Sequence, residues 1–418
     1  MKDFKLYFFQ ILIITAFTVS VCPISAQINF AHVMPPPPAP QVFEAFPSLV
    51  AVESKFFDYD NDGDEDLLLT GNPSGSTNTG NTIIKLYEND GGKFINEVDL
   101  PFEIFQTSGS VPFQIIDYDS DGLLDILGWS LSWGGSGSGA TILKNTQDGF
   151  EILNDLPSDS LDCVFCEPIG SIDFGDYDLD GDLDFVFSNN EGTKLFENDE
   201  GVYGILQQFD SGVDAYSKFV DVDSDGLLDV FLMRWDDNED ATVFLNEGGL
   251  FQAEMEQDGV LVSAINNVEF FDYDQDSDQD LIVSQRSSNR FSVYENIDGL
   301  YVSVFSLTFQ VSSSLAFQII DLNDDGLQDI ILSGSGDNGI QALMNQGTDG
   351  TFPFLSEELF DFLSQPVTHA AAADIDADND IDLLIARNSY FGDPKVDLVL
   401  DVEGSFEIQQ NSMFTSEP

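Results

Sequence analysis

The chain has 418 residues, of which 76 are Asp or Glu and only 13 are Lys or Arg, so its formal charge is −63. Nucleic acid and anionic lipid are recognised through basic side chains, and this charge excludes both as default partners. Hydrophobic residues make up 42% of the chain and aromatic residues 12%, which predicts a packed core instead of a disordered acidic chain.

The N-terminal 26 residues resemble a secretory signal. Lys2 and Lys5 precede an apolar stretch at residues 6–21, and Ala26 offers a cleavage point. A lipoprotein anchor at Cys22 is the alternative, although Val21 before it is bulkier than such sites normally accept. We therefore expect a protein that is secreted or held at the cell surface, with the periplasm as another location. No membrane insertion is expected after cleavage.

A run of carboxylates recurs seven times from residue 58 onward, with the spacing Asp-x-Asp-x-Asp-Gly-x-x-Asp or a close variant. We call each run an acidic loop and number its positions 1 to 9; the loops begin at Asp58, Asp117, Asp176, Asp221, Asp272, Asp321 and Asp374. Their spacing of 45 to 59 residues indicates one supersecondary unit used many times. Clustered like charges repel unless a cation lies among them, and oxygen ligands on a short loop suit Ca²⁺.

Each acidic loop stands between short β-prone segments. In the first copy, residues 49–57 precede the loop, Leu67 to Leu69 follow it, and a further segment at 83–87 leads to the turn Asn89-Asp90-Gly91-Gly92 before Phe94. This asparagine turn recurs with every loop, at Asn145, Asn198, Asn246, Asn296 and Asn345, with Asp401 in the last copy. The pattern predicts four short strands in each repeat and shows no helical period.

Seven repeats of four strands predict an all-β fold, a seven-bladed β-propeller of four-stranded antiparallel blades. A solenoid of stacked repeats is the alternative. We expect residues 1–26 to be the signal, 27–44 a Pro-rich linker with a stiff proline run at 35–38, 45–412 the propeller and 413–418 a tail. Residues 29–33 could add a strand to the closing blade, which leaves the manner of ring closure open.

The paired motifs, FFDYDNDGDEDLLL followed by LYENDGGKF in the first copy, resemble FG-GAP/VCBS repeats. This is the family of the integrin α-subunit propellers and of many exported bacterial proteins, and the resemblance covers about residues 45–410. It implies a propeller with Ca²⁺ in the loop between the first and second strands of each blade. It also implies adhesion or ligand binding as the commonest role, and some members accompany catalytic domains.

The family template assigns metal ligands to positions 1, 3, 5 and 9 of each acidic loop, with Asp64 added in the first. In chain order the candidate ligands are Asp58, Asp60, Asp62, Asp64 and Asp66; Asp117, Asp119, Asp121 and Asp125; Asp176, Asp178, Asp180 and Asp184; Asp221, Asp223, Asp225 and Asp229; Asp272, Asp274, Asp276 and Asp280; Asp321, Asn323, Asp325 and Asp329; and Asp374, Asp376, Asp378 and Asp382.

Up to seven structural Ca²⁺ ions are therefore expected. Gly at position 6 permits the positive φ that such a turn needs. Ser277 replaces it in the fifth loop and Asn379 in the seventh. Asn tolerates the left-handed conformation better than Ser does, so we expect the site that begins at Asp272 to be the weakest.

The loops between second and third strands should open on the face opposite to the acidic loops. In or beside them lie Trp129, Trp133, Arg234, Trp235, Arg286, Arg290, Arg387 and Tyr390. Exposed aromatic platforms with a few arginines suit a glycan or a surface protein as ligand. The alternative is that Trp packs between blades and Arg pairs with acidic neighbours.

Support for catalysis is small, and we assign no catalytic residue. Motifs for a serine nucleophile, a zinc protease or a phosphate loop are absent. His369 is expected to pack or to line a channel, and Cys163 with Cys166 to form a small loop disulfide. We expect a monomeric binding or adhesion module. A Ca²⁺-dependent polysaccharide lyase and a purely structural surface component are the alternatives.

Overall fold

The computed structural model describes residues 49–73, 82–101, 104–105, 113–129, 140–146, 149–153, 171–189, 192–199, 202–209, 215–234, 240–261, 265–285, 290–308, 315–334, 340–347, 354–358, 367–387, 395–401 and 406–408. The chain divides into two compact units, Met1–Gln41 and Val42–Pro418, and all described residues belong to the second. The expected signal segment, linker, disulfide and C-terminal tail lie outside these ranges.

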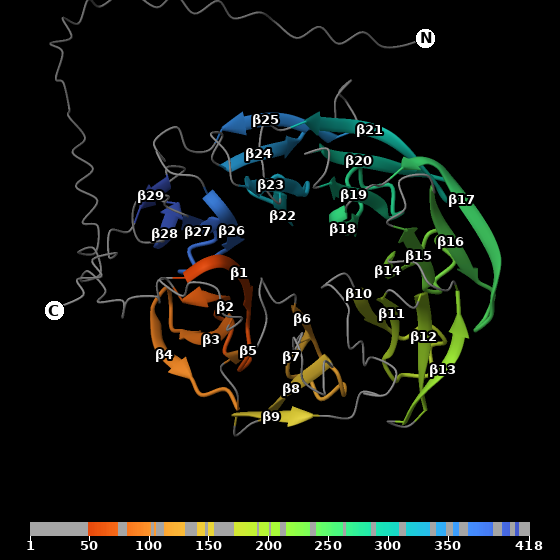
Figure 1. The fold of residues 1–418 in the computed structure, drawn as a ribbon. Coiled ribbons are helices and arrows are strands. Elements are labelled where there is room, and N and C mark those ends of the chain that lie inside the picture. The colour runs from red at the N-terminus through yellow and green to blue at the C-terminus, as the bar shows by residue number, and fades with distance from the viewer. Residues whose placement is uncertain are drawn as a thin grey trace, which may run out of the picture. The chain divides into compact units, whose positions relative to one another are not determined.

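Seven antiparallel sheets follow one another around a ring (Figure 1), which confirms the predicted seven-bladed propeller. The first blade consists of β1 (Leu49–Phe57), β2 (Asp66–Pro73), β3 (Thr82–Asn89) and β4 (Phe94–Val98), with β5 (Ile104–Phe105) beside β3. The second consists of β6 (Phe113–Ile116), β7 (Asp125–Trp129), β8 (Ala140–Thr146) and β9 (Gly149–Leu153). The third consists of β10 (Ser171–Gly175), β11 (Asp184–Asn189), β12 (Gly192–Asp199) and β13 (Val202–Gln208).

The remaining four blades repeat this order from the innermost strand outward. The fourth consists of β14 (Ala215–Val220), β15 (Asp229–Arg234), β16 (Asp240–Asn246) and β17 (Phe251–Leu261). The fifth consists of β18 (Ile265–Phe271), β19 (Asp280–Gln285), β20 (Arg290–Ile297) and β21 (Leu300–Thr308). The sixth consists of β22 (Leu315–Ile320), β23 (Asp329–Gly334), β24 (Ile340–Asn345) and β25 (Phe354–Glu358). The seventh consists of β26 (Val367–Ala373), β27 (Asp382–Arg387), β28 (Lys395–Asp401) and β29 (Phe406–Ile408).

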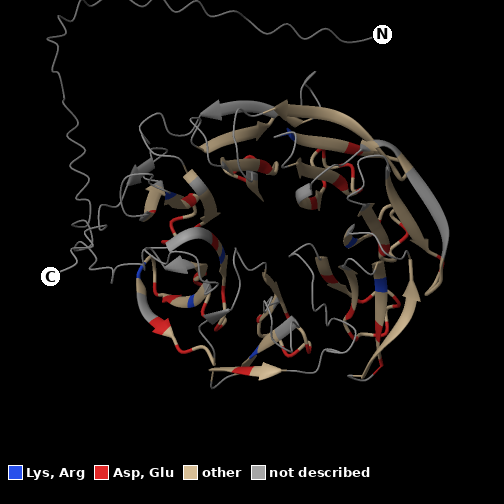
Figure 2. Cartoon of the chain, in the orientation of Figure 1, with Lys and Arg blue, Asp and Glu red and all other residues tan. Residues whose placement is uncertain are grey.

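The first two strands of every blade pair in the same register. In each case the residue just before the acidic loop lies opposite the aspartate at position 9, as in Phe57↔Asp66 and Ala373↔Asp382. All seven acidic loops therefore connect the innermost strand to the second strand with the same length. Figure 2 shows red acidic residues concentrated on these connections and few blue basic residues elsewhere.

The hydrophobic core lies between the blades. The second strands carry unbroken apolar runs, such as Leu67-Leu68-Leu69 at 0% exposure, because both of their faces are covered. Seven buried clusters result, and each joins two adjacent blades. In an antiparallel blade whose faces are both buried, neighbouring blades stabilise one another chiefly by this apolar contact.

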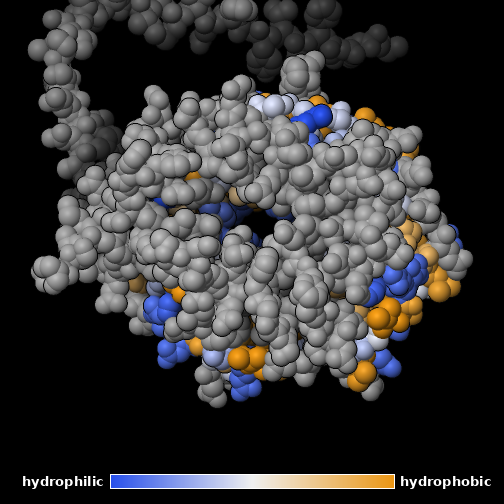
Figure 3. All heavy atoms as spheres, viewed as in Figure 1, coloured by the Kyte–Doolittle hydropathy of each residue, from blue (hydrophilic) through white to orange (hydrophobic). Residues whose placement is uncertain are grey.

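Polar side chains also join the innermost strands around the central opening, where hydrophilic residues are visible in Figure 3. Gln114 of β6 donates to Asp173 of β10 (2.8 Å), and Lys218 of β14 pairs with Glu269 of β18 (2.7 Å). In the sixth blade Gln318 donates to the carbonyl of Ala372 on β26 (2.8 Å). Where the structure describes them, innermost strands of different blades share no main-chain hydrogen bonds, so these side-chain bonds connect them directly.

The ring closes without strand exchange among the described residues, since the first sheet contains only β1 to β5 and the seventh only β26 to β29. The backbone N–H of Ser54 on β1 donates to Nε2 of His369 on β26 (3.2 Å), so His369 packs against the first blade, on the innermost strand. Burial lowers the pKa of His369 to about 4, which keeps its imidazole neutral at neutral pH and able to accept this hydrogen bond. A shared cluster that includes Leu67, Ile375 and Leu384 completes the seam.

Candidate metal centres

Every acidic loop folds around its first aspartate. The two oxygens of Asp58 accept the backbone N–H groups of Asp62 (3.1 Å) and Gly63 (3.0 Å), at positions 5 and 6. The same pair of bonds recurs at Asp117, Asp176, Asp221, Asp272, Asp321 and Asp374. In all seven loops the residue at position 5 also accepts the N–H of position 7, as Asp62 does from Asp64 (2.9 Å).

Two residues of each loop adopt a left-handed backbone. Position 6 has φ between 72° and 98° in every loop, including Ser277 (80°) and Asn379 (72°). Position 4 is also left-handed, and no residue there is glycine: Asn61, Ser120, Leu179, Ser224, Gln275, Asp324 and Ala377. Because a β-carbon is disfavoured in this conformation, each such residue costs about 1 kcal/mol. The loops are therefore strained in the same way.

The carboxylates that the sequence groups together do converge. In the first five loops one oxygen from each of three aspartates lies within 4.8 Å of the other two. The groups are Asp58, Asp60 and Asp62; Asp117, Asp119 and Asp125; Asp176, Asp178 and Asp184; Asp221, Asp223 and Asp225; and Asp272, Asp274 and Asp276. Carboxylate oxygens alone, arranged on one tight turn, are the donor set that a hard divalent cation prefers.

The electrostatics of these loops favour a cation. Burial, followed by repulsion from neighbouring carboxylates, raises the pKa of the position 3 aspartates Asp60, Asp178, Asp223, Asp274 and Asp376. Oδ1 of Asp274 and Oδ1 of Asp376 are buried and have no hydrogen-bond partner. A buried carboxylate oxygen without a donor is costly, and a coordinated ion would satisfy it. These residues therefore fit a bound divalent cation.

Position 9 has a second role that the spacing does not reveal. Oδ2 of Asp66 accepts the N–H of Tyr59 (2.9 Å) at position 2, and Oδ1 accepts the N–H of Asn89 (2.8 Å) in the asparagine turn. Asp125, Asp184, Asp229, Asp280 and Asp329 make the same two bonds. The position 9 aspartate thus ties the acidic loop to the asparagine turn of its own blade.

Burial of the position 9 carboxyl is nearly complete, and it raises the pKa of that group. The value is about 7 for Asp66, Asp184 and Asp280 and about 6 for Asp125 and Asp229. The two backbone donors act in the opposite direction but do not offset the burial. These values hold without a metal ion, and an adjacent divalent cation would lower them.

The asparagine turn carries this connection to the blade that precedes it in the ring. Nδ2 of Asn296 in the fifth blade donates to the carbonyl of Val222 (2.8 Å), which is position 2 of the fourth loop. The same bond runs from Asn145 to Tyr59, from Asn246 to Tyr177, from Asn345 to Tyr273 and, across the closing seam, from Asn89 to Ile375. At these five seams the two repeated motifs are therefore joined by hydrogen bonds between blades, which the spacing within one repeat does not indicate.

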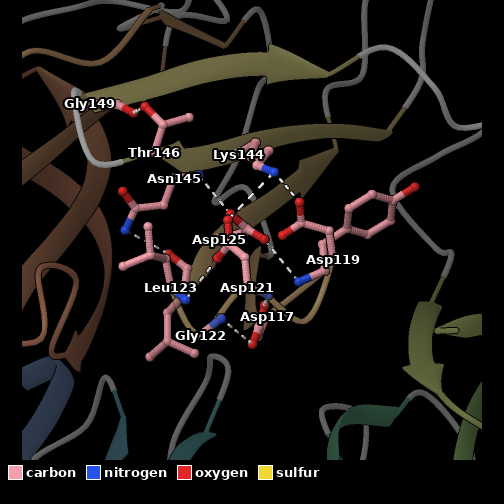
Figure 4. Close-up of polar contacts among 12 residues, drawn as sticks. Asp117, Asp119, Asp121, Gly122, Leu123, Asp125, Lys144, Asn145, Thr146 and Gly149 are labelled. Atoms are coloured by element: carbon pink, nitrogen blue, oxygen red, sulfur yellow. Dashed lines mark hydrogen bonds and ion pairs between the residues drawn. The ribbon is translucent and has the colours of Figure 1, made fainter. Parts of the chain in front are cut away.

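Figure 4 shows the second loop with these contacts. Asp117 accepts the N–H of Gly122, and Asp125 accepts the N–H of Asn145. In the same view the ammonium of Lys144, which lies just before Asn145 on β8, pairs with Asp119 and lies 3.5 Å from Asp121. A basic side chain therefore enters the carboxylate cluster of this loop.

Asp64, which was included with the ligands of the first loop, has a different contact. Its Oδ2 accepts the N–H of Gly91 (2.8 Å) in the asparagine turn. Its backbone N–H donates to Asp62. The side chain of Asp64 therefore braces the turn of its own blade.

Half of the residues of the predicted ligand face lie outside what the structure describes, namely Trp133, Trp235, Arg286 and Tyr390. Trp129 and Arg234 are placed only as strand ends of β7 and β15. The two remaining arginines are described. The guanidinium of Arg290 donates to Ser306 Oγ (2.8 and 3.0 Å), and Arg387 pairs with the buried Asp397. Both arginines thus bond within their own blades.

A cavity of about 710 Å³ opens beside the fourth and fifth acidic loops. Lys218, Glu269 and Asp173 line it together with loop residues such as Asp225 and Ser277. Lys218 is paired with Glu269, and Asp173 accepts the N–H of Phe219 (2.9 Å) and a bond from Gln114. Lys218 and Glu269 are therefore already engaged with each other, and Asp173 with two neutral donors. No helix of the described ranges has the length and hydrophobicity to cross a bilayer.

Comparison with solved structures returns other proteins of similar fold. An Agrocybe aegerita lectin, whose structure addresses specific recognition of non-reducing terminal N-acetylglucosamine, is 16% identical; the match covers 87% of this chain and 91% of the lectin, with a TM-score of 0.50. BBS1N, in its complex with ARL6DN, is 12% identical over 88% of this chain and 96% of that one, with a TM-score of 0.49. The V. cholerae biofilm matrix protein Bap1 is 14% identical over 84% and 66%, with a TM-score of 0.38. At these identities the likeness concerns the fold alone.

Comparison with family models is more specific. None of the curated proteins compared with the chain matches it in sequence. The model of the FG-GAP-like repeat matches residues 58–128, 221–310 and 321–385, which together make up more than half of the chain. Each matched segment begins at position 1 of an acidic loop. The chain therefore belongs to the family of FG-GAP-like repeat proteins.

Proposed function

We propose that the protein is an exported β-propeller that holds structural Ca²⁺ in its acidic loops and binds a glycan or a surface protein. The observation that carries the metal part is the convergence of three carboxylate oxygens within 4.8 Å in each of the first five loops. The N-terminal sequence, which resembles a secretory signal, supports export to a compartment where Ca²⁺ is abundant.

The aspartates at positions 1, 3 and 5, with one side of the position 9 carboxylate, would hold the ion. A bound Ca²⁺ supplies charge neutralisation to a cluster that otherwise repels itself. The position 9 aspartate also receives the N–H groups of position 2 and of the asparagine turn, and position 2 accepts the asparagine of the next blade. Ordering one acidic loop therefore strengthens the contact between two blades.

Native mass spectrometry and thermal unfolding, each with Ca²⁺, with Mg²⁺ and with EDTA, test the metal part. We expect several bound Ca²⁺ ions and a melting temperature that falls on chelation and recovers with Ca²⁺. Asp178→Asn should remove one ion. Asp199 is an exposed carboxylate at the end of β12, outside the acidic loops, and Asp199→Asn should remove none. A protein that carries no ion in millimolar Ca²⁺ and melts at the same temperature in EDTA would contradict the proposal.

The loops between second and third strands are the proposed ligand-binding face. Their wealth of Trp and Arg supports a sugar or an acidic group as ligand, and a lectin of the same fold shows that this architecture can serve sugar recognition. A glycan array and a panel of extracellular proteins should retain the wild-type chain. Trp133→Ala with Trp235→Ala should lose that retention at an unchanged melting temperature, and retention equal to wild type would overturn this assignment.

A further inference from the structure

One position differs systematically among blades that are otherwise repeated. It is the residue just before the asparagine turn on the third strand, and at Lys144 and Glu295 its side chain contacts a residue of the acidic loop. In chain order this position, which we call the gate position, holds Glu88, Lys144, Glu197, Leu245, Glu295, Met344 and Leu400. Three blades thus offer a carboxylate there, three an apolar side chain and one a cation.

The glutamates add negative charge to their loops. The Tyr273 hydroxyl at position 2 of the fifth loop donates to Glu295 Oε2 (3.4 Å), so this carboxylate lies beside the loop. Glu88 in the first blade lies near enough to Asp60 at position 3 to interact with it electrostatically. Carboxylates this close to the cluster raise its attraction for a divalent ion.

Lys144 has the opposite effect in the second loop. Its ammonium pairs with Asp119 Oδ2 and lies 3.5 Å from Asp121 Oδ2, at positions 3 and 5 (Figure 4). A lysine ammonium is charged at neutral pH, and the two aspartates beside it favour the charged form. The second loop therefore contains its own counter-ion at two of the positions that would face a metal.

We propose that Lys144 is the internal cation of the second acidic loop and that the gate position determines which loops take up Ca²⁺. The inference rests on the proposed function, since it assumes that the other loops bind Ca²⁺. The second loop folds without metal. Its affinity for Ca²⁺ is at least about tenfold below that of loops with a glutamate at the gate position, because a fixed positive charge repels the ion at contact distance. The loops with Glu88 and Glu197 at the gate position form the tightest group. The fifth loop also has a glutamate there, Glu295, but Ser277 at position 6 weakens its site.

Matched substitutions in the second and third loops test this. Asp178→Asn and Asp119→Asn change the same position 3 carboxylate, and native mass spectrometry at limiting Ca²⁺ counts the ions that each variant retains. We expect Asp178→Asn to lose one ion and Asp119→Asn to lose none. Loss of one ion in both variants would overturn the inference, and absence of bound Ca²⁺ in the wild type would overturn the proposed function instead.

Lys144→Glu supplies the complementary test, because it gives the second loop the gate of the first, third and fifth. We expect one additional tight Ca²⁺ ion, which the double variant with Asp119→Asn should lose again. Lys194→Gln serves as a charge control, since Lys194 lies on the third strand of the next blade, four residues before Asn198, opposite Phe187. An unchanged ion count in Lys144→Glu, or the same gain in Lys194→Gln, would show that the gate has no such effect.

Thermal unfolding in EDTA gives a readout that does not depend on counting ions. Without its lysine and without metal, the second loop has four aspartates and no cation, so Lys144→Gln should lower the melting temperature in EDTA. Added Ca²⁺ should restore the wild-type value. A melting temperature that is lowered equally in EDTA and in Ca²⁺ would indicate that Lys144 merely packs, and this result too would contradict the inference.

Discussion

Two adjacent glycines at the closing seam allow a controlled test of how the ring is held shut. Both have a left-handed backbone, Gly91 at φ +58° and Gly92 at φ +82°. A β-carbon on Gly91 would meet no atom within 4 Å, whereas one on Gly92 would lie 2.5 Å from Cβ and 3.0 Å from Cα of Asp376 in the seventh blade. Alanine therefore adds backbone strain at either position but a steric clash across the seam only at Gly92.

The expected difference follows from these contacts. Alanine in the left-handed region costs about 1 kcal/mol at each site. At Gly92 the atoms that must yield are Cβ and Cα of Asp376, which cannot move without the backbone, so overpacking adds about 1–3 kcal/mol. For a unit of the size of Val42–Pro418 the unfolding entropy is about 0.8 kcal/mol/K, so Gly92→Ala should melt roughly 1–4 °C below Gly91→Ala.

Calorimetry in saturating Ca²⁺ and denaturant unfolding of both variants would measure this difference. Asp376 is the position 3 carboxylate of the seventh loop, so Gly92→Ala should also weaken Ca²⁺ binding at that site, while Gly91→Ala should not. Equal melting temperatures for the two variants would refute the seam contact as a source of stability. A loss at Gly91 larger than at Gly92 would refute the steric reasoning itself.

Three further predictions concern the hydrogen-bond chain and pH. Asn296→Ala should lower the free energy of unfolding by about 3 kcal/mol in denaturant titration, because the buried carbonyl of Val222, the half-buried carbonyl of Gln279 and the N–H of Gly299 lose their partner. Gln346→Ala, at an exposed amide, should change it by less than about 0.5 kcal/mol. The pKa values of the position 9 carboxyls are higher in the folded protein than in the unfolded chain. The free energy of unfolding of the metal-free protein should therefore fall as pH rises from about 4 to about 7, and Ca²⁺ at neutral pH should reverse the loss. A metal-free stability that rises over this range would contradict this prediction. The pKa of His369 is lowered, so its contribution to the free energy of unfolding should be present above pH 6.5 and lost as pH falls toward about 4. The control is His369→Gln, which keeps an acceptor for Ser54, and relative to it the wild type should lose stability only below pH 6.5. Parallel pH curves for the two proteins would count against this seam contact.

The repeat architecture could be predicted from local sequence because each blade is built from contacts that are close in the chain. Seven acidic loops and seven asparagine turns in constant order require seven equivalent units, and apolar runs of about five residues permit only short strands. The convergence of positions 1 and 3 with position 5 or 9 was also predictable, since it depends on one nine-residue turn. Ser277 follows the same rule: it adopts the left-handed conformation that glycine has elsewhere, because the register on both sides of the loop imposes it.

The connections between blades depended on the tertiary structure. Asn89 meets Ile375 of another blade across 286 residues. Within the second blade, Lys144 on the third strand meets Asp119 in the acidic loop, 25 residues before it, and the motif spacing does not indicate this contact either. Buried carbonyls and clustered carboxylates must find partners, and the packing of strands and blades decides which side chains are near enough to serve. The same sequence motif therefore predicts seven similar loops, whereas the neighbouring strand determines the charge that each loop encounters.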